Sequence, residues 1–232
     1  AWMPDNQING VDFVLPFRFS EGAWQLGTRG PISLRIAEVG NQVTVKNIAA
    51  DLQGAYPWSE NNPLLLSDVS ADLLGGKIIM QQLRMPQHDP ALLRVQNISS
   101  SELISAVNPK QFAMSGPVSG ALPLWLDNEK WIIKDGWLTN PGPMTLRIDK
   151  DTADAVVKDN MAAGAAINWL RYMEISHSWT KINLDNLGVL TMQSTVTGNS
   201  RVDGKVGTVN LNYTHEENVF TLWRSLRFGD NL

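Results

Sequence analysis

The feature that most constrains this sequence is a two-residue alternation of apolar side chains, which recurs along much of its length. It is most regular in the stretch Gly116–Ile148, where a leucine stands at every second position from Leu122 to Leu126. This period places alternate side chains on opposite faces of a strand, and Gly, Pro, Asn and Asp stand at the corners between the short runs. The stretch therefore predicts three or four antiparallel strands with one apolar face, and no acid, base or nucleophile in it is placed for a reaction.

The same pattern recurs in both directions along the chain. Between Gly10 and Ser20 every second residue is apolar, which predicts one strand, and Pro16 favours an edge or a bulge because proline cannot donate to the ladder. A spacing of about ten residues per strand is typical of an antiparallel all-β architecture. Further strands are expected near Ile32–Ile36, Val43–Val45, Leu64–Leu73, Lys77–Arg84, Ala91–Gln96 and Val206–Thr214.

About three short amphipathic helices are expected to interrupt the strands. Ser99–Glu102 has the spacing of a capping box, in which serine and glutamate satisfy free backbone N–H groups, and the helix it opens should end at Asn108. A second helix is expected from Asp151 to about Met173. A third is expected to begin with the capping box Thr214–Glu217.

Composition bounds the class of protein. A chain of 232 residues suits one all-β domain, with expected sub-modules 1–97, 98–150 and 151–232. Charged residues make up 18%, below the roughly 25% of typical soluble domains, while nine tryptophans suit a boundary between apolar and aqueous surroundings. A net charge of −4 without a basic run argues against nucleic-acid binding. The absence of cysteine excludes disulfides and thiol chemistry. The chain starts at Ala1 rather than Met, which indicates a piece of a longer protein.

No residue pattern predicts an enzyme, a cofactor or a metal site. His88, His177 and His215 lie far apart, and none belongs to a metal-binding pair. Asp68 and Asp72 fall on one face of an expected strand, where solvation accounts for them.

The apolar stripes are more numerous than three helices can cover. The sheet is therefore expected to curl, and a curled sheet either fills its interior or leaves a channel. An unfilled apolar groove would bind acyl chains, since each buried CH₂ contributes about 0.8 kcal/mol. The candidate groove residues are Val11, Phe13, Leu15, Phe17, Phe19, Ile32, Leu34, Ile36, Leu122, Leu124, Leu126, Trp131, Ile133, Met144, Leu146 and Ile148.

From about Tyr56 onward the chain resembles a known family. The segments that carry the resemblance are Val118–Leu124, Ile133–Trp137, Asn140–Pro143 and Glu217–Asn231. They are similar to the C-terminal part of an AsmA-like envelope protein of Gram-negative bacteria, in the family that includes TamB and YhdP.

The resemblance implies a long curled β-groove, built as a repeat bridge across the periplasm from an inner-membrane anchor, that carries phospholipid towards the outer membrane. It also implies that the C-terminal end docks a small outer-membrane lipoprotein (YnbE-like) by β-strand addition, with a periplasmic helper (YdbL-like). Strand addition needs an open edge. The edge candidates are Val206, Thr208, Asn210, Asn212 and Thr214. The alternative is an envelope scaffold or assembly factor that docks protein partners and carries no lipid.

Overall fold

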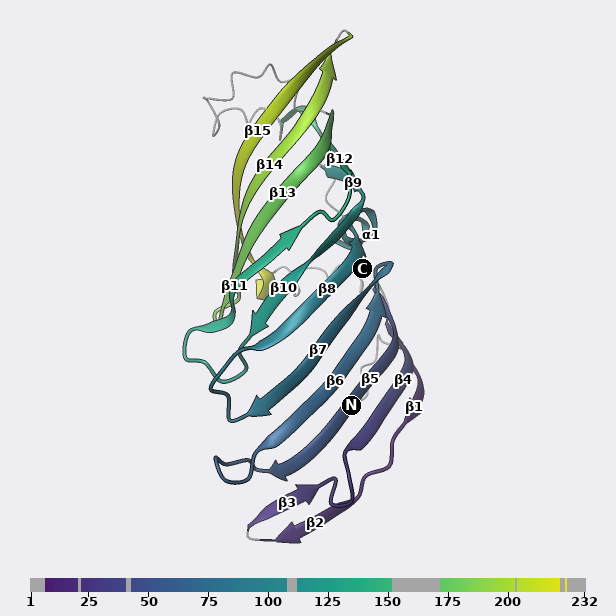
Figure 1. Ribbon diagram of the computed structural model, residues 1–232, viewed down its shortest axis with the longest axis vertical. Coiled ribbons are helices and arrows are strands. Elements are labelled where there is room, and N and C mark those ends of the chain that lie inside the picture. Colours follow the sequence, from purple (N-terminus) through teal and green to yellow (C-terminus); the bar gives the residue numbers. More distant parts are fainter. Residues whose placement is uncertain are drawn as a thin grey trace. The chain divides into compact units, whose positions relative to one another are not determined.

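The computed structural model describes residues 7–20, 22–40, 43–107, 112–151, 172–202, 204–221 and 224. These residues are mainly antiparallel β-strand (Figure 1), as the alternation predicts. The chain divides into two compact units. The first unit consists of Ala1–Ile98 with Pro123–Asp127, and the second consists of Ser99–Leu122 with Asn128–Leu232.

The first unit is an antiparallel ladder in the order β1-β4-β5-β6-β7-β8, and the hairpin β2-β3 adds to it by pairing β3 with β5. The strands are β1 (Gln7–Asp12), β2 (Phe17–Ser20), β3 (Ala23–Leu26), β4 (Ile32–Gly40), β5 (Thr44–Tyr56), β6 (Leu64–Leu73), β7 (Gly76–Met85) and β8 (Ala91–Ser99). The predicted bounds of β6 are confirmed, and the predicted strands at β7 and β8 are confirmed with slightly longer bounds.

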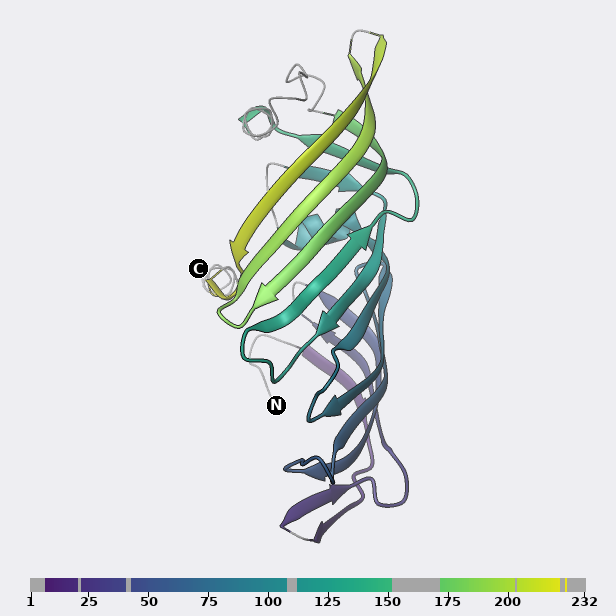
Figure 2. The same cartoon turned by 60° about the vertical axis from the view of Figure 1, so that its left-hand side comes forward.

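The second unit is built around β13, which pairs with β14 on one side and with β11 and β12 on the other. β12 also pairs with β9, and β14 pairs with β15. Figure 2 shows β13, β14 and β15 as three long neighbouring strands. The elements are α1 (Ser100–Val107), β9 (Phe112–Ser115), β10 (Pro117–Leu124), β11 (Trp131–Thr139), β12 (Met144–Ile148), β13 (Tyr172–Asp185), β14 (Val189–Val202) and β15 (Lys205–Asn218).

The prediction of a single strand between Gly10 and Ser20 is wrong. β1 ends at Asp12 and β2 begins at Phe17, so the alternating stripe is divided between two strands. The break falls just before β2 because Pro16 has no N–H to donate to a ladder. Its carbonyl instead accepts a hydrogen bond from Gly27 N at 2.9 Å, which closes the β2-β3 hairpin.

Of the expected helices, the first is confirmed. Glu102 N donates to Ser99 Oγ at 3.3 Å, so Ser99 caps α1. For the second helix, residues 152–171 lie outside the described residues, but its predicted end is wrong because Tyr172 and Met173 begin β13.

The third expected helix begins four residues later than predicted. Residues 214–217 belong to β15, where Glu217 pairs with Leu190 of β14, so the ladder already satisfies the backbone groups that a capping box would serve. Helical structure starts after Asn218, whose Oδ1 accepts hydrogen bonds from Phe220 N at 3.1 Å and Thr221 N at 3.0 Å. Asn218 is therefore the N-cap.

Candidate functional site

The first unit has one apolar and one polar face, and two neighbouring rows across four strands show the division. The apolar row runs Ile32, Leu52, Leu66 and Leu83 from β4 to β7. The adjacent row, one residue along each strand, runs Ser33, Asp51, Ser67 and Gln82. Because successive side chains point to opposite faces, every strand contributes to both.

The polar face is held by its own contacts. Ser33 Oγ donates to Asp51 Oδ1 at 3.0 Å, and the Arg35 guanidinium lies 3.5 Å from the same carboxylate oxygen. These groups are satisfied at the surface, and nothing in them resembles a catalytic arrangement.

The apolar face forms its own cluster. Its buried members are Met80, Leu83, Met85 and Ala91, and partly buried residues pack against them. The described elements of the first unit are all strands, so within that part of the chain the apolar side chains pack against one another. Most of the face consequently stays half-buried. Among the groove candidates, Leu124 packs on this cluster, Ile32 is buried, and Leu34 and Ile36 are half-buried.

The remaining candidates of the first unit are largely exposed. Val11 pairs with Ile36 at the edge strand β1, and Phe13 and Leu15 lie between β1 and β2. Phe17 and Phe19 are 57% and 59% exposed, with ring centroids 5.5 and 5.2 Å from that of Trp24. Leu126 is 61% exposed beyond the end of β10, where its N–H donates to Gln87 Oε1 at 2.7 Å.

The second unit has an apolar face of its own. Ile148, Met173, Val209 and Leu211 are buried together, and Leu146, Val196 and Tyr213 pack against them. The register supports this, because Met144 pairs with Ile175, Leu146 with Met173, and Val196 with Leu211. The candidates Met144, Leu146 and Ile148 therefore lie on one apolar face.

Leu122 and Ile133 meet over Gly136 of β11. A Cβ added at Gly136 would lie 2.9 Å from Leu122 Cδ2 and 3.1 Å from Ile133 Cγ2. Gly136 pairs with the buried Ile182 of β13. These two candidates thus lie on the same face of the sheet as Ile182.

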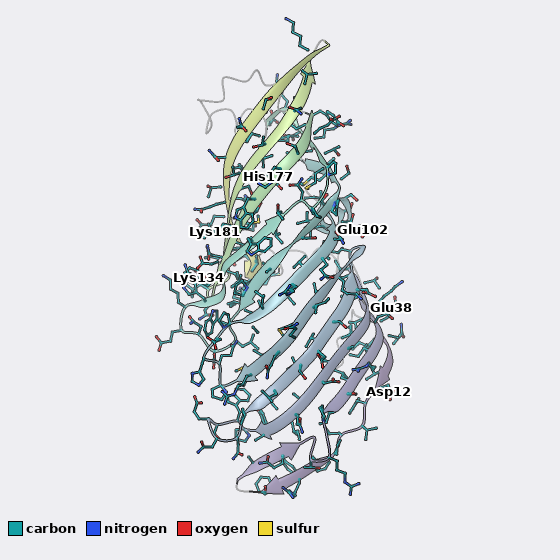
Figure 3. All side chains as sticks on the ribbon, in the orientation of Figure 1. Asp12, Glu38, Glu102, Lys134, His177 and Lys181 are labelled. Atoms are coloured by element: carbon teal, nitrogen blue, oxygen red, sulfur yellow. The ribbon has the colours of Figure 1, made fainter. Side chains whose placement is uncertain are left out.

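Trp131 has different surroundings from Ile133, although the sequence places both in one stripe. The register of β11 against β13 shifts between them, and the ammonium groups of Lys130 and Lys134 lie 4.9 and 4.4 Å from the Trp131 ring centroid. The side chains of Lys134 and Lys181 (Figure 3) both reach the Asp135 carboxylate, at 3.8 and 3.5 Å. Trp131 is therefore held by cation–π contacts.

The edge candidates lie on the polar face of β15. Val206, Thr208, Asn210, Asn212 and Thr214 are exposed, and their odd-numbered neighbours Val209 and Leu211 are buried. Hydrogen bonds to β14 order this face, from Thr197 Oγ1 to Asn210 Oδ1 at 3.0 Å and from Thr195 Oγ1 to Asn212 Oδ1 at 3.3 Å. Within the described residues, β15 pairs with β14 alone.

Two groupings of residues were not predicted from the sequence. Trp137 and Trp179 stack with ring centroids 4.8 Å apart and 9° between their planes. Tyr213, His215 and Glu217 form a hydrogen-bonded chain along β15. Their i, i+2, i+4 spacing would have indicated a shared face if the predicted strand Val206–Thr214 had been extended to Asn218.

Neither a metal-binding cluster nor a membrane-spanning helix occurs among the described residues. In that part of the chain no three His, Cys, Asp or Glu side chains are grouped to hold a metal ion. No helix found there has the length and apolar character to cross a membrane.

Two comparisons with known proteins point to the same family. The profile of the YdbH-like family, described as "Intermembrane phospholipid transport protein YdbH", matches residues 1–232. The chain is 81% identical over 232 residues to the "Probable phospholipid transport protein YdbH" of Escherichia coli (strain K12), a match that covers 100% of the chain and 26% of that protein. The chain thus spans about a quarter of this relative's length. No solved structure gives a significant match.

Proposed function

Since the chain belongs to the YdbH-like family of intermembrane phospholipid transport proteins, we propose that its apolar sheet faces line a groove that shields phospholipid acyl chains between the inner and outer membranes. The groove candidates from Val11 to Ile148 are its proposed lining. The protein would act in the periplasm near the outer membrane, with a full-length parent anchored in the inner membrane.

The observation that carries this proposal is the row Ile32–Leu52–Leu66–Leu83 beside the row Ser33–Asp51–Ser67–Gln82. A sheet that is apolar on one face and polar on the other can present a continuous apolar surface while its back stays solvated. Each acyl CH₂ that it buries contributes about 0.8 kcal/mol, so an acyl chain of ordinary length is held without any polar contact. Transport of this kind needs no catalytic residue.

The experiment compares Leu34→Arg with Ser33→Arg. Leu34 lies on the apolar face opposite Ala50, whereas the exposed Ser33 lies on the polar face beside Asp51. A guanidinium among acyl chains is costly to desolvate, so Leu34→Arg should lower the phospholipid that co-purifies with the protein, measured by native mass spectrometry, by about half, which is the share held by the first unit. Ser33→Arg can pair with Asp51 and should retain lipid. A Leu34→Arg protein that melts normally and carries lipid at the wild-type level would show that this face is not the groove.

The proposal includes a docking edge. The outer edge of β15 would accept an extended strand of a small outer-membrane lipoprotein (YnbE-like), with a helper (YdbL-like) acting beside it. The pairing of β15 with β14 alone, among the described residues, supports this assignment, because an unpaired edge offers a row of backbone donors and acceptors.

A scaffold that docks the lipoprotein without carrying lipid is the alternative. The same mass spectrum separates the two functions, since a scaffold should carry no stoichiometric phospholipid while it binds the lipoprotein.

A further inference from the structure

We propose that Glu217, positioned by His215, binds the primary ammonium group of an ethanolamine phospholipid on the apolar face of the second unit. This inference rests on the proposed function, because it names the headgroup of the lipid that the groove would hold. It concerns the hydrogen-bonded side chains of Tyr213, His215 and Glu217 in β15, whose polar groups are not needed to bind acyl chains.

The three side chains share one face of β15. Tyr213, His215 and Glu217 stand at i, i+2 and i+4, and alternate positions of a strand point the same way. Their partners in β14 are Ser194, Met192 and Leu190. The same face continues to the buried Val209 and Leu211, so the chain of polar groups lies at one end of an apolar surface.

The contacts within the chain define the role of the histidine. The Tyr213 hydroxyl lies 3.5 Å from His215 Nδ1, and His215 Nε2 lies 3.2 Å from Glu217 Oε2. Both contacts are satisfied at once when the tyrosine O–H donates to Nδ1 and the Nε2–H donates to the carboxylate. With that arrangement of protons the imidazole of His215 is neutral. His215 then fixes the orientation of Glu217 without neutralising its charge.

The carboxylate is also without a nearby cation on its face. In the described β13, β14 and β15, the one lysine or arginine at a position on that face is Lys205, at the opposite end of β15 from Glu217. The residues level with His215 and Glu217 are Ile182, Leu184, Leu190 and Met192. The Glu217 side chain is 39% exposed, so a ligand can reach it. A carboxylate accepts up to about four hydrogen bonds, and the interactions found among the described residues use one.

An accessible negative charge beside an apolar surface suits an amphiphile with a cationic end. A primary ammonium has three donors and fits a carboxylate held in this way. A phosphatidylglycerol headgroup has a phosphate but no cation, so Glu217 would repel it. The chemistry therefore selects ethanolamine over glycerol phospholipid.

The test uses a neutral variant and a matched control on the opposite face. Glu217→Gln removes the charge and keeps the shape, and Glu216→Gln makes the same change one residue earlier, where the exposed Glu216 pairs with Thr191 on the polar face. Each purified protein is incubated with vesicles of equal parts phosphatidylethanolamine and phosphatidylglycerol. Bound lipid is then quantified by mass spectrometry, and folding is checked by thermal melting.

We expect the wild type and Glu216→Gln to favour phosphatidylethanolamine, and Glu217→Gln to lose that preference by about three- to tenfold, while total bound lipid stays near the wild-type amount. An unchanged lipid ratio in Glu217→Gln would overturn the headgroup assignment and leave the groove intact. A wild type that binds neither lipid would instead overturn the groove, and this inference with it.

Discussion

At the scale of single residues, backbone crowding explains why glycine is needed at one interior position of a strand. Gly120 lies within β10, and a Cβ built there would fall on the carbonyl oxygen of Trp137 in the neighbouring strand β11. Backbone cannot move aside as the end of a flexible side chain can, so any larger residue must push the two strands apart. The effect is one of packing rather than of backbone dihedral angles.

Gly120→Ala should therefore lower the free energy of unfolding by about 2 kcal/mol, measured as a shift of the urea midpoint. Gly142→Ala is the control, because a Cβ at Gly142 has nothing within 4 Å, and its midpoint should move little. Equal midpoints for the two variants would mean that β10 and β11 do not approach as closely as the structure has them.

The candidate residues themselves show what alternation can predict. Leu34, Leu146 and Ile148 lie on apolar faces, as their stripes indicate, because the strands around them pair in a regular register. Trp131 belongs to a stripe in the sequence, yet its register shifts before Ile133. Such an irregularity depends on the strand paired with it, β13, which lies about 50 residues further along the chain, so a local pattern does not contain it.

At the scale of elements, strands bounded by turn residues were predictable and the long C-terminal strands were less so. β6 and β7 are separated by Leu74 and Gly75, both with positive φ, and each strand is ten residues long. β13 and β14 are 14 residues long and carry serine, threonine and histidine where strict alternation would place apolar side chains. The ends of β13 and β14 are set by their pairing with each other. The capping-box spacing of Thr214–Glu217 was misleading because these residues pair with β14 and belong to a strand.

The edge of β15 carries a prediction about partner binding. His177, Thr197 and Asn210 lie in one row across β13, β14 and β15, and His177 is shown in Figure 3. Neighbouring strands lie about 4.8 Å apart, so a strand added to β15 would lie within reach of Asn210 and about 14 Å from His177. A photo-crosslinking residue at Asn210 should capture the lipoprotein in cells, and one at His177 should not.

This pair of positions controls for exposure and for face, because both side chains point to the polar side of the same sheet. Equal capture from the two positions would indicate binding over the face rather than at the edge. No capture from Asn210, in cells where the lipoprotein is present, would contradict strand addition at β15.

At the scale of the whole molecule, the two units repeat one design: an antiparallel ladder with its own apolar cluster and a polar back. Met80, Leu83, Met85 and Ala91 form the cluster of the first unit, and Ile148, Met173, Val209 and Leu211 form that of the second. A charged content of 18% is low for a soluble domain, which agrees with a molecule whose surface includes apolar strand faces. Neither cluster depends on residues of the other unit, so each can be interrupted separately.

If both faces belong to one conduit, they act in series, and the last prediction follows from that. Leu34→Arg interrupts the first unit and Leu146→Arg the second, with Thr145→Arg, on the opposite face beside Glu174, as the control for the second unit. Each single variant should abolish phospholipid transport between the membranes while reducing the lipid bound per protein by about half, because the untouched face still holds lipid. The double variant should be no worse than either single variant in transport, yet should bind almost no lipid. Transport that falls by half in each single variant, in step with bound lipid, would instead show two independent carriers and contradict a conduit.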